Sequence, residues 1–172
     1  MDNKTIVKTL SFYVDLMTLH DENEFKIKGY NNAIFNIERY NNLIAETSLE
    51  DLEKISGVGK STAKAIEEIN VSGQLQALET LKNQTPAGII DMLSIKGVGA
   101  KKIKLIWKNL DITDTTALLD CIEKGELSKV KGFGEKTAQN IKETLLYLEA
   151  NRHKLHFAEA EALSNQLLKD MR

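Results

Sequence analysis

Three short segments of this 172-residue chain follow one pattern. In each, an apolar residue and a spacer precede Gly, a second apolar residue and another Gly, and a polar segment typical of a helix start follows. The first glycines of the copies, at 57, 97 and 132, lie 40 and 35 residues apart, so the pattern is an internal repeat. The repeat predicts three copies of one unit, a glycine turn between two helices, at residues 55–61, 95–101 and 130–136.

The physical chemistry of this unit favours an anion. Glycine adopts backbone angles that a Cβ forbids and lets another backbone come close. The apolar residue between the glycines would anchor the turn in the core, and the next helix would direct its unpaired N–H groups and positive dipole end outward. Such a helix-hairpin-helix unit can hold a phosphate oxygen but reads no base, so it predicts nucleic-acid binding without sequence preference. The alternative is three plain turns between packed helices, since glycine also ends helices.

Composition indicates an ordinary globular protein. Hydrophobic residues make up 42% and charged residues 28% of the chain. We expect no membrane span and no signal peptide, because no run of about 18 apolar residues occurs. The single cysteine, Cys121, excludes a disulfide within the chain and suits a reducing cytoplasm. His153 and His156 could share a helix face, but no metal-ligand spacing surrounds them.

Charge is distributed unevenly. The net charge of −2 argues against a global electrostatic attraction to nucleic acid. Residues 95–110 contain no acid and surround the second glycine turn, so phosphate contact is the interpretation we favour over a merely solvated face. The lysines of this segment are Lys96, Lys101, Lys102, Lys104 and Lys108.

The predicted fold class is all-α, because apolar residues recur at helical spacing along nearly the whole chain. We expect two helical subdomains, residues 1–84 and 85–172, carrying the three helix-hairpin-helix motifs between them. The single proline, Pro86, suits the first position of the helix that opens the second subdomain.

Local signals place the individual helices. A capping box is predicted at Thr47 to Glu50, and turns are predicted at Gly73, Gly88 and Gly125. The helices expected are residues 6–17, 30–44, 49–52, 60–70, 74–83, 87–93, 100–109, 114–123, 135–150 and 155–170.

The spacing of residues along the chain argues against most other kinds of functional site. Residues 57–62 resemble the end of a nucleotide-binding P-loop, but Lys54 stands where that motif needs its first glycine. Asp111 and Asp114 are too sparse for a two-metal site. One enzymatic alternative remains open, in which Lys60 or Lys64 forms a Schiff base with an abasic sugar. These lysines lie four apart on one helix face, where each could lower the pKa of the other.

The whole chain resembles the amino-terminal region of bacterial family X DNA polymerases, relatives of the repair polymerase β. Residues 25–33 and 55–69 resemble a helix and the first hairpin of the small lyase-type domain. Residues 93–107 resemble the second hairpin, which begins the fingers-like subdomain. Residues 125–144 are similar to the third hairpin of bacterial members, and 152–172 resemble the helix leading to the palm.

The resemblance implies roles for individual residues. Lys26 and Tyr30 match positions that hold a 5′-phosphate in a gap, although Tyr30 could equally be a core residue. Hairpin carbonyls in the family can ligate Na⁺ or K⁺, here those of Glu53, Ile55 and Val58 in the first loop and Leu93, Ile95 and Val98 in the second. No other cofactor is expected. The backbone contacts with DNA would come from Gly57, Gly59, Lys60, Ser61, Gly97, Gly99, Lys101, Lys102, Gly132, Gly134 and Lys136.

Two departures qualify these expectations. Ala65 stands at the position of the family's Schiff-base lysine. The palm, which carries the metal-binding aspartates, would follow Arg172, so we expect no polymerase activity from these residues alone.

The function expected is sequence-independent binding of gapped, nicked or primer-template DNA for a repair polymerase. A palm domain in the same parent chain and a bacterial cytoplasm, near the nucleoid, are the implied partner and location. An abasic-site lyase and a helix-hairpin-helix scaffold for protein contacts are the alternatives.

Overall fold

The computed structural model describes residues 1–148 and 150, and all of the regular structure in this part of the chain is helical, as predicted. A predicted helix at 155–170 lies outside the described residues. The final described helix covers residues 135–148. The preceding elements are α1 (Asn3–Leu19), α2 (Glu24–Ile37), η1 (Ile44–Glu46), α3 (Leu49–Leu52), α4 (Lys60–Ser72), α5 (Gln76–Asn83), α6 (Ala87–Met92), α7 (Ala100–Leu110), α8 (Thr115–Glu123) and η2 (Leu127–Lys129).

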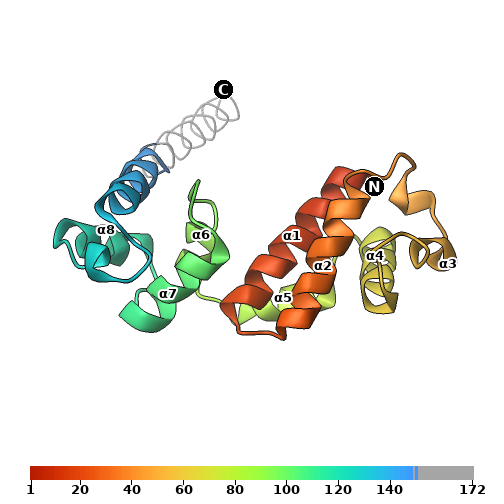
Figure 1. Cartoon of the computed structure of the whole chain (residues 1–172), viewed down its shortest axis with the longest axis horizontal. Coiled ribbons are helices and arrows are strands. Elements are labelled where there is room, and N and C mark those ends of the chain that lie inside the picture. Colours follow the sequence, from red (N-terminus) through yellow and green to blue (C-terminus); the bar gives the residue numbers. More distant parts are fainter. Residues whose placement is uncertain (149, 151–172) are drawn as a thin grey trace, which may run out of the picture.

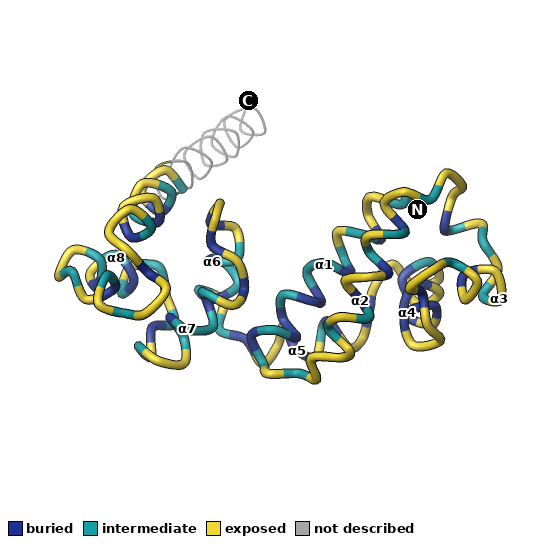
Figure 2. The backbone as a smooth tube through the Cα atoms, in the orientation of Figure 1, coloured by how far each residue is buried: buried dark blue, intermediate teal, exposed yellow. Residues whose placement is uncertain are grey.

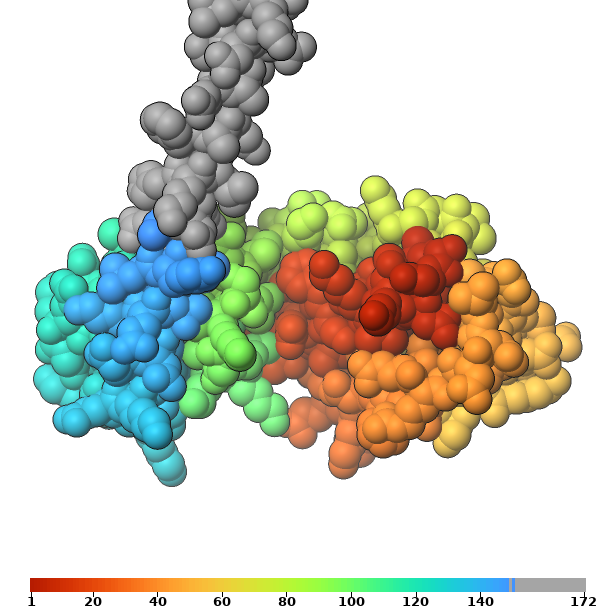
Figure 3. All heavy atoms as spheres, turned by 90° about the horizontal axis from the view of Figure 1, so that it is seen from above, coloured from red at the N-terminus to blue at the C-terminus, as the bar shows by residue number. Residues whose placement is uncertain are grey.

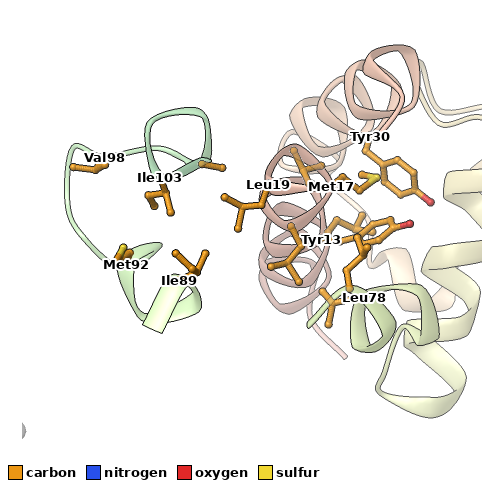
Figure 4. Packing of buried hydrophobic residues seen from close by; sticks show 14 of the residues in the cluster. Tyr13, Met17, Leu19, Tyr30, Leu78, Ile89, Met92, Val98 and Ile103 are labelled. Atoms are coloured by element: carbon orange, nitrogen blue, oxygen red, sulfur yellow. The ribbon is translucent and has the colours of Figure 1, made fainter. Parts of the chain in front are cut away.

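The helices form two lobes along the long axis of the molecule (Figures 1 and 3). α1 and α2 lie side by side in the first lobe with α3, α4 and α5 around them, and α6, α7 and α8 form the second lobe. α1 also packs against α7, so one continuous hydrophobic cluster runs through both lobes. At the joint, Leu19 of α1 points toward Ile89 and Ile103 (Figure 4). The predicted boundary at residue 85 stays a prediction.

Side-chain caps begin the first two helices, α1 and α2. The carboxylate of Asp2 accepts a hydrogen bond from the N–H of Thr5 at 2.8 Å, and the Asn23 side chain accepts from Phe25 at 2.8 Å. These bonds satisfy N–H groups that a helix start leaves unpaired. α1 and α2 then pack through their apolar faces, where the rings of Tyr13 and Tyr30 meet edge to face at 5.3 Å.

Polar contacts close the joint between the lobes. The hydroxyl of Thr85 donates to the carbonyl of Leu81 at 2.7 Å, so it must accept its 2.8 Å hydrogen bond from Nε2–H of His20. The His20 ring meets Trp107 edge to face at 5.5 Å. An ion pair between Asp21 and Lys104 of α7 lies beside them.

Three expectations about helix ends are wrong. The predicted helix through Ile44 ends at Ile37, because Asn3 of α1 binds the chain that follows: Oδ1 accepts from the Ile44 N–H at 2.8 Å and Nδ2 donates to the Asn42 carbonyl at 2.9 Å. The cap of α3 is Ser48 rather than Thr47. Pro86 is the N-cap of α6 rather than its first residue.

Gly88 is also not a turn residue, because it lies inside α6. A Cβ at this position would come within 2.4 Å of the Thr113 carbonyl oxygen and 2.7 Å of the Asp114 Cα. The glycine therefore permits the close packing of α6 against the start of α8, a tertiary requirement that the chain around it does not reveal.

Candidate nucleic-acid interface

The three hairpins share one backbone geometry. In each, the N–H of the central apolar residue donates to the carbonyl three residues earlier: Val58 to Ile55 at 2.9 Å, Val98 to Ile95 at 3.1 Å and Phe133 to Val130 at 3.0 Å. All three central residues are buried, as predicted. They anchor the loops in the core while both glycines of every hairpin stay exposed, as do most turns of the chain (Figure 2).

The first glycine of each hairpin has a left-handed backbone. The φ angles are +80° at Gly57, +84° at Gly97 and +100° at Gly132, a region that other residues adopt only with strain. Gly57 also meets α2, since a Cβ there would lie 3.1 Å from the Asn32 carbonyl oxygen and 3.0 Å from Nδ2 of Asn36. The conformation of the chain therefore explains the first glycine.

The second glycine has a different explanation. Gly59 and Gly99 have φ angles of −88° and −81°, which any residue adopts, so backbone angles do not explain the glycine at these two positions. A Cβ at Gly59, Gly99 or Gly134 would meet no atom within 4 Å. A glycine that the described protein does not itself require suits the close approach of an external backbone.

The helix after each hairpin begins at once, as predicted. The carbonyls of Gly59, Gly99 and Gly134 accept its first hydrogen bonds, each at 2.9 Å at the shortest. Within residues 1–148 and 150, no acceptor receives a hydrogen bond from the backbone N–H of either glycine or of the first two helical residues in any hairpin. Each hairpin thus presents a set of free donors at the positive end of a helix dipole.

The first hairpin forms one wall of an open pocket of about 580 Å³. Lys26, Gly29 and Tyr30 of α2 form the facing wall, so α2 and the first hairpin meet across it. The structure therefore places Lys26 and Tyr30, which the resemblance assigns to a 5′-phosphate, opposite the hairpin that it assigns to the DNA backbone.

The cation that α2 presents to this pocket is Lys26, whose Nζ also lies 3.4 Å from the Glu22 carboxylate. Burial alone would lower the pKa of Lys26, but contacts with Tyr13 and Glu22 outweigh it, and the pKa is raised. Burial raises the pKa of Tyr30, while a hydrogen bond with Ser61 acts in the opposite direction. Tyr30 is only 5% exposed, so its ring belongs to the core and its polar edge to the pocket.

The lysines around the second hairpin divide into two groups. Lys104 pairs with Asp21, and the Nζ of Lys108 lies 3.8 Å from the centroid of the Trp107 ring. Lys102 lies 5.8 Å from the Phe133 ring of the third hairpin. Lys96 and Lys101 are exposed at the loop itself. The charge available to a ligand is therefore smaller than the sequence suggests, because part of it joins the lobes and hairpins.

The remaining predicted contacts lie at helix starts. Lys136 is exposed in the first turn of the helix at 135–148. Lys60 and Lys64 are exposed on α4, and neither is among the described residues that line the first-hairpin pocket. Ala65 is buried.

The structure also reveals contacts that sequence reasoning missed. Asn32 and Asn36 of α2 lie against the Cα of Gly57. The carbonyl of Asn32 accepts a 2.9 Å hydrogen bond from the Asn36 side chain. Asparagines in an exposed helix carry no pattern that predicts this support. In the described part of the chain, no helix has the length and apolar character needed to cross a bilayer.

Comparison with known proteins agrees with this geometry. Residues 1–75 match the model of the helix-hairpin-helix domain, and residues 89–145 match the SAM-like helix-hairpin-helix tandem. The Bacillus subtilis (strain 168) protein DNA polymerase/3'-5' exonuclease PolX is 30% identical over 145 residues, which are 84% of this chain and 25% of that protein. The chain thus spans about a quarter of that relative. Its two lobes are helix-hairpin-helix units that correspond to the helix-hairpin-helix region of a family X DNA polymerase.

Proposed function

We propose that this chain binds DNA backbone without base specificity. The free N–H groups at three exposed hairpins, beside second glycines with open space around them, carry this proposal. Phosphate oxygens satisfy such donors, whereas a base edge has no defined partner among them. The similarity to a DNA polymerase supports the same class of ligand.

The preferred substrate is gapped DNA with a 5′-phosphate. The chain would serve a repair polymerase of the bacterial cytoplasm, whose palm domain would belong to the same parent chain. Lys26 and the polar edge of Tyr30 face the first hairpin across its pocket, so one terminal phosphate can meet a positive side chain and backbone donors together. The second and third hairpins would hold other parts of the duplex backbone.

Monovalent cations fit the same loops. The carbonyls of Glu53 and Val58 accept no hydrogen bond from the described residues, and that of Ile55 accepts one. The carbonyls of Leu93, Ile95 and Val98 repeat this pattern. Carbonyl oxygens are suitable ligands for hard cations, so Na⁺ or K⁺ would help neutralise the DNA backbone.

Fluorescence anisotropy tests this function. A gapped duplex with a 5′-phosphate should bind more tightly than the same duplex with a 5′-hydroxyl, and affinity should fall steeply as salt rises. Lys26→Gln should remove most of the phosphate-dependent difference, by a factor of about ten for one charge-assisted contact. Lys8→Gln, an exposed lysine of α1, is the matched control. A DNA affinity that depends neither on salt concentration nor on the 5′-phosphate would favour a protein-interaction scaffold instead.

A lyase has less support than binding. Schiff-base lysines are commonly desolvated, whereas Lys60 and Lys64 are exposed and Ala65 occupies the family position. Borohydride trapping on a gapped 5′-abasic oligonucleotide should therefore yield no covalent adduct, and an adduct lost in Lys60→Gln or Lys64→Gln would restore the lyase alternative.

A further inference from the structure

A second open pocket, of about 910 Å³, lies at the end of the first lobe remote from α7. We call it the α2–α3 pocket, because the residues that line it come from the C-terminal part of α2, the chain that leads to α3, α3 itself and the start of the first hairpin. Lys54, Ile55 and Ser56 line both this pocket and the first-hairpin pocket. A strand held by the first hairpin can therefore continue directly into the α2–α3 pocket.

Hydrogen bonds hold the chain between α2 and α3, which lines this pocket, in place. Asn3 of α1 binds the backbone of Asn42 and Ile44 at 2.9 and 2.8 Å. The hydroxyl of Thr47 donates to the carbonyl of Leu43 at 3.0 Å. The pocket is thus preformed, which reduces the ordering cost of binding.

Arg39 presents its guanidinium to the pocket, and the Phe35 ring lies next to that group but outside the pocket lining. The guanidinium of Arg39 lies 3.5 Å from the centroid of the Phe35 ring and donates to the Phe35 carbonyl at 2.8 Å. Arg39 also lines the pocket, and Phe35 remains 54% exposed. A large aromatic exposed to water beside a planar cation is a typical stacking platform for unpaired bases.

The pocket also presents hydrogen-bond acceptors that suit the amino groups of a base. Asp51 is neutralised by Lys54 at 2.7 Å, but Glu46 forms no ion pair with any of residues 1–148 or 150. A lone carboxylate repels phosphate and accepts hydrogen bonds from exocyclic amino groups, as Glu does from cytosine N4. The side-chain oxygen of Asn36, whose Nδ2 already donates to Asn32, is a second acceptor.

We propose that the α2–α3 pocket holds an unpaired nucleobase of the strand that the first hairpin grips, stacked on the Arg39 guanidinium, which the Phe35 ring supports, and read by Glu46. The site favours bases that carry an exocyclic amino group over thymine. The inference rests on the proposed DNA binding and extends it to a 5′ flap of unpaired nucleotides beyond the gap.

Anisotropy titrations of the full chain with four gapped duplexes test the site. The duplexes carry no flap, a 5′ flap of three dC, one of three dT, or one of three abasic sugar phosphates. The dC flap should bind at least about fivefold more tightly than the abasic flap, the lower end of the range for one stacked base. Phe35→Ala should remove this gain, and Tyr147→Ala, an exposed aromatic of the other lobe, should keep it. Glu46→Gln should reduce the preference for dC over dT.

Each of these results supports or contradicts the proposed base site. Equal binding of the dC and abasic flaps, or a full gain in Phe35→Ala, would overturn the base site. The duplex without a flap tests the proposed function separately, since failure to bind it contradicts DNA-backbone binding as a whole. In that case a titration with single-stranded oligo(dC) against an abasic oligomer still decides whether the pocket holds a base.

Discussion

At the scale of single residues, the two glycines of a hairpin have different physical roles. Gly57 adopts a left-handed backbone and touches α2, so the folded chain needs it. Gly59 has an extended φ of −88° and open space around it, so the folded chain does not. A single methyl group can therefore separate the binding role of the hairpin from its structural role.

The substitution Gly59→Ala tests this separation. It should cost no more than about 1 kcal/mol of unfolding free energy, because alanine is a somewhat poorer N-cap than glycine. DNA affinity should fall about tenfold, because the new Cβ holds the strand away from the free N–H groups. Urea unfolding and anisotropy measure the two effects.

Gly57→Ala is the control for that experiment. It should cost about 1–3 kcal/mol of unfolding free energy through backbone strain. If Gly59→Ala binds DNA like the unsubstituted chain, the close approach of DNA at the second glycine is wrong.

At the scale of elements, α6 and α8 approach through a residue with no side chain. The Cα of Gly88 lies against the chain that leads into α8, where a Cβ would meet the Thr113 carbonyl oxygen at 2.4 Å. Since both contacting atoms belong to backbone, no rotamer change can relieve the clash, and one of the two elements must move.

Gly88→Ala should therefore lower the unfolding free energy by about 1–3 kcal/mol, despite the higher helix propensity of alanine. Gly29→Ala in α2 is the matched control, since a Cβ there meets nothing within 4 Å. That variant should gain up to about 1 kcal/mol. Chemical denaturation measures both, and equal effects at the two positions would contradict the packing role of Gly88.

At the scale of the whole molecule, the joint between the lobes contains a titratable group. Burial lowers the pKa of His20 below its ordinary value of 6.5, and the nearby charge of Lys108 lowers it further, while Glu22 acts in the opposite direction. The unfolded chain therefore takes up this proton first as the pH falls. The contribution of neutral His20 to stability is complete above pH 6.5, declines below it, and levels off once the folded chain is protonated as well.

Urea unfolding between pH 5 and pH 8 should show this loss of stability toward acid, and His20→Gln should flatten that part of the profile. Glutamine keeps a donor for the Thr85 hydroxyl but has no charge to gain. A profile of His20→Gln identical to that of the unsubstituted chain would show that the joint does not respond to this proton.

Local residues predicted most of the helices and all three hairpins, because helical periodicity and the glycine turn are properties of short segments. The burial of Val58, Val98 and Phe133 follows from the same local pattern. Where the prediction was wrong, a distant residue intervened. α2 ends early because Asn3 binds the chain 39 and 41 residues away, and Gly88 is in a helix because the α7–α8 turn lies against it.

The sequence by itself thus determined the all-helical class, the repeat and the outward N–H groups of each hairpin, since glycine conformation and helix starts depend on neighbouring residues. Only the tertiary structure decided which groups meet. It placed Lys26 across from the first hairpin, used Lys104 to join the lobes, and opened the pocket beside Arg39. Contacts between segments far apart in the chain depend on how the helices pack, and no single short segment of the sequence determines that packing.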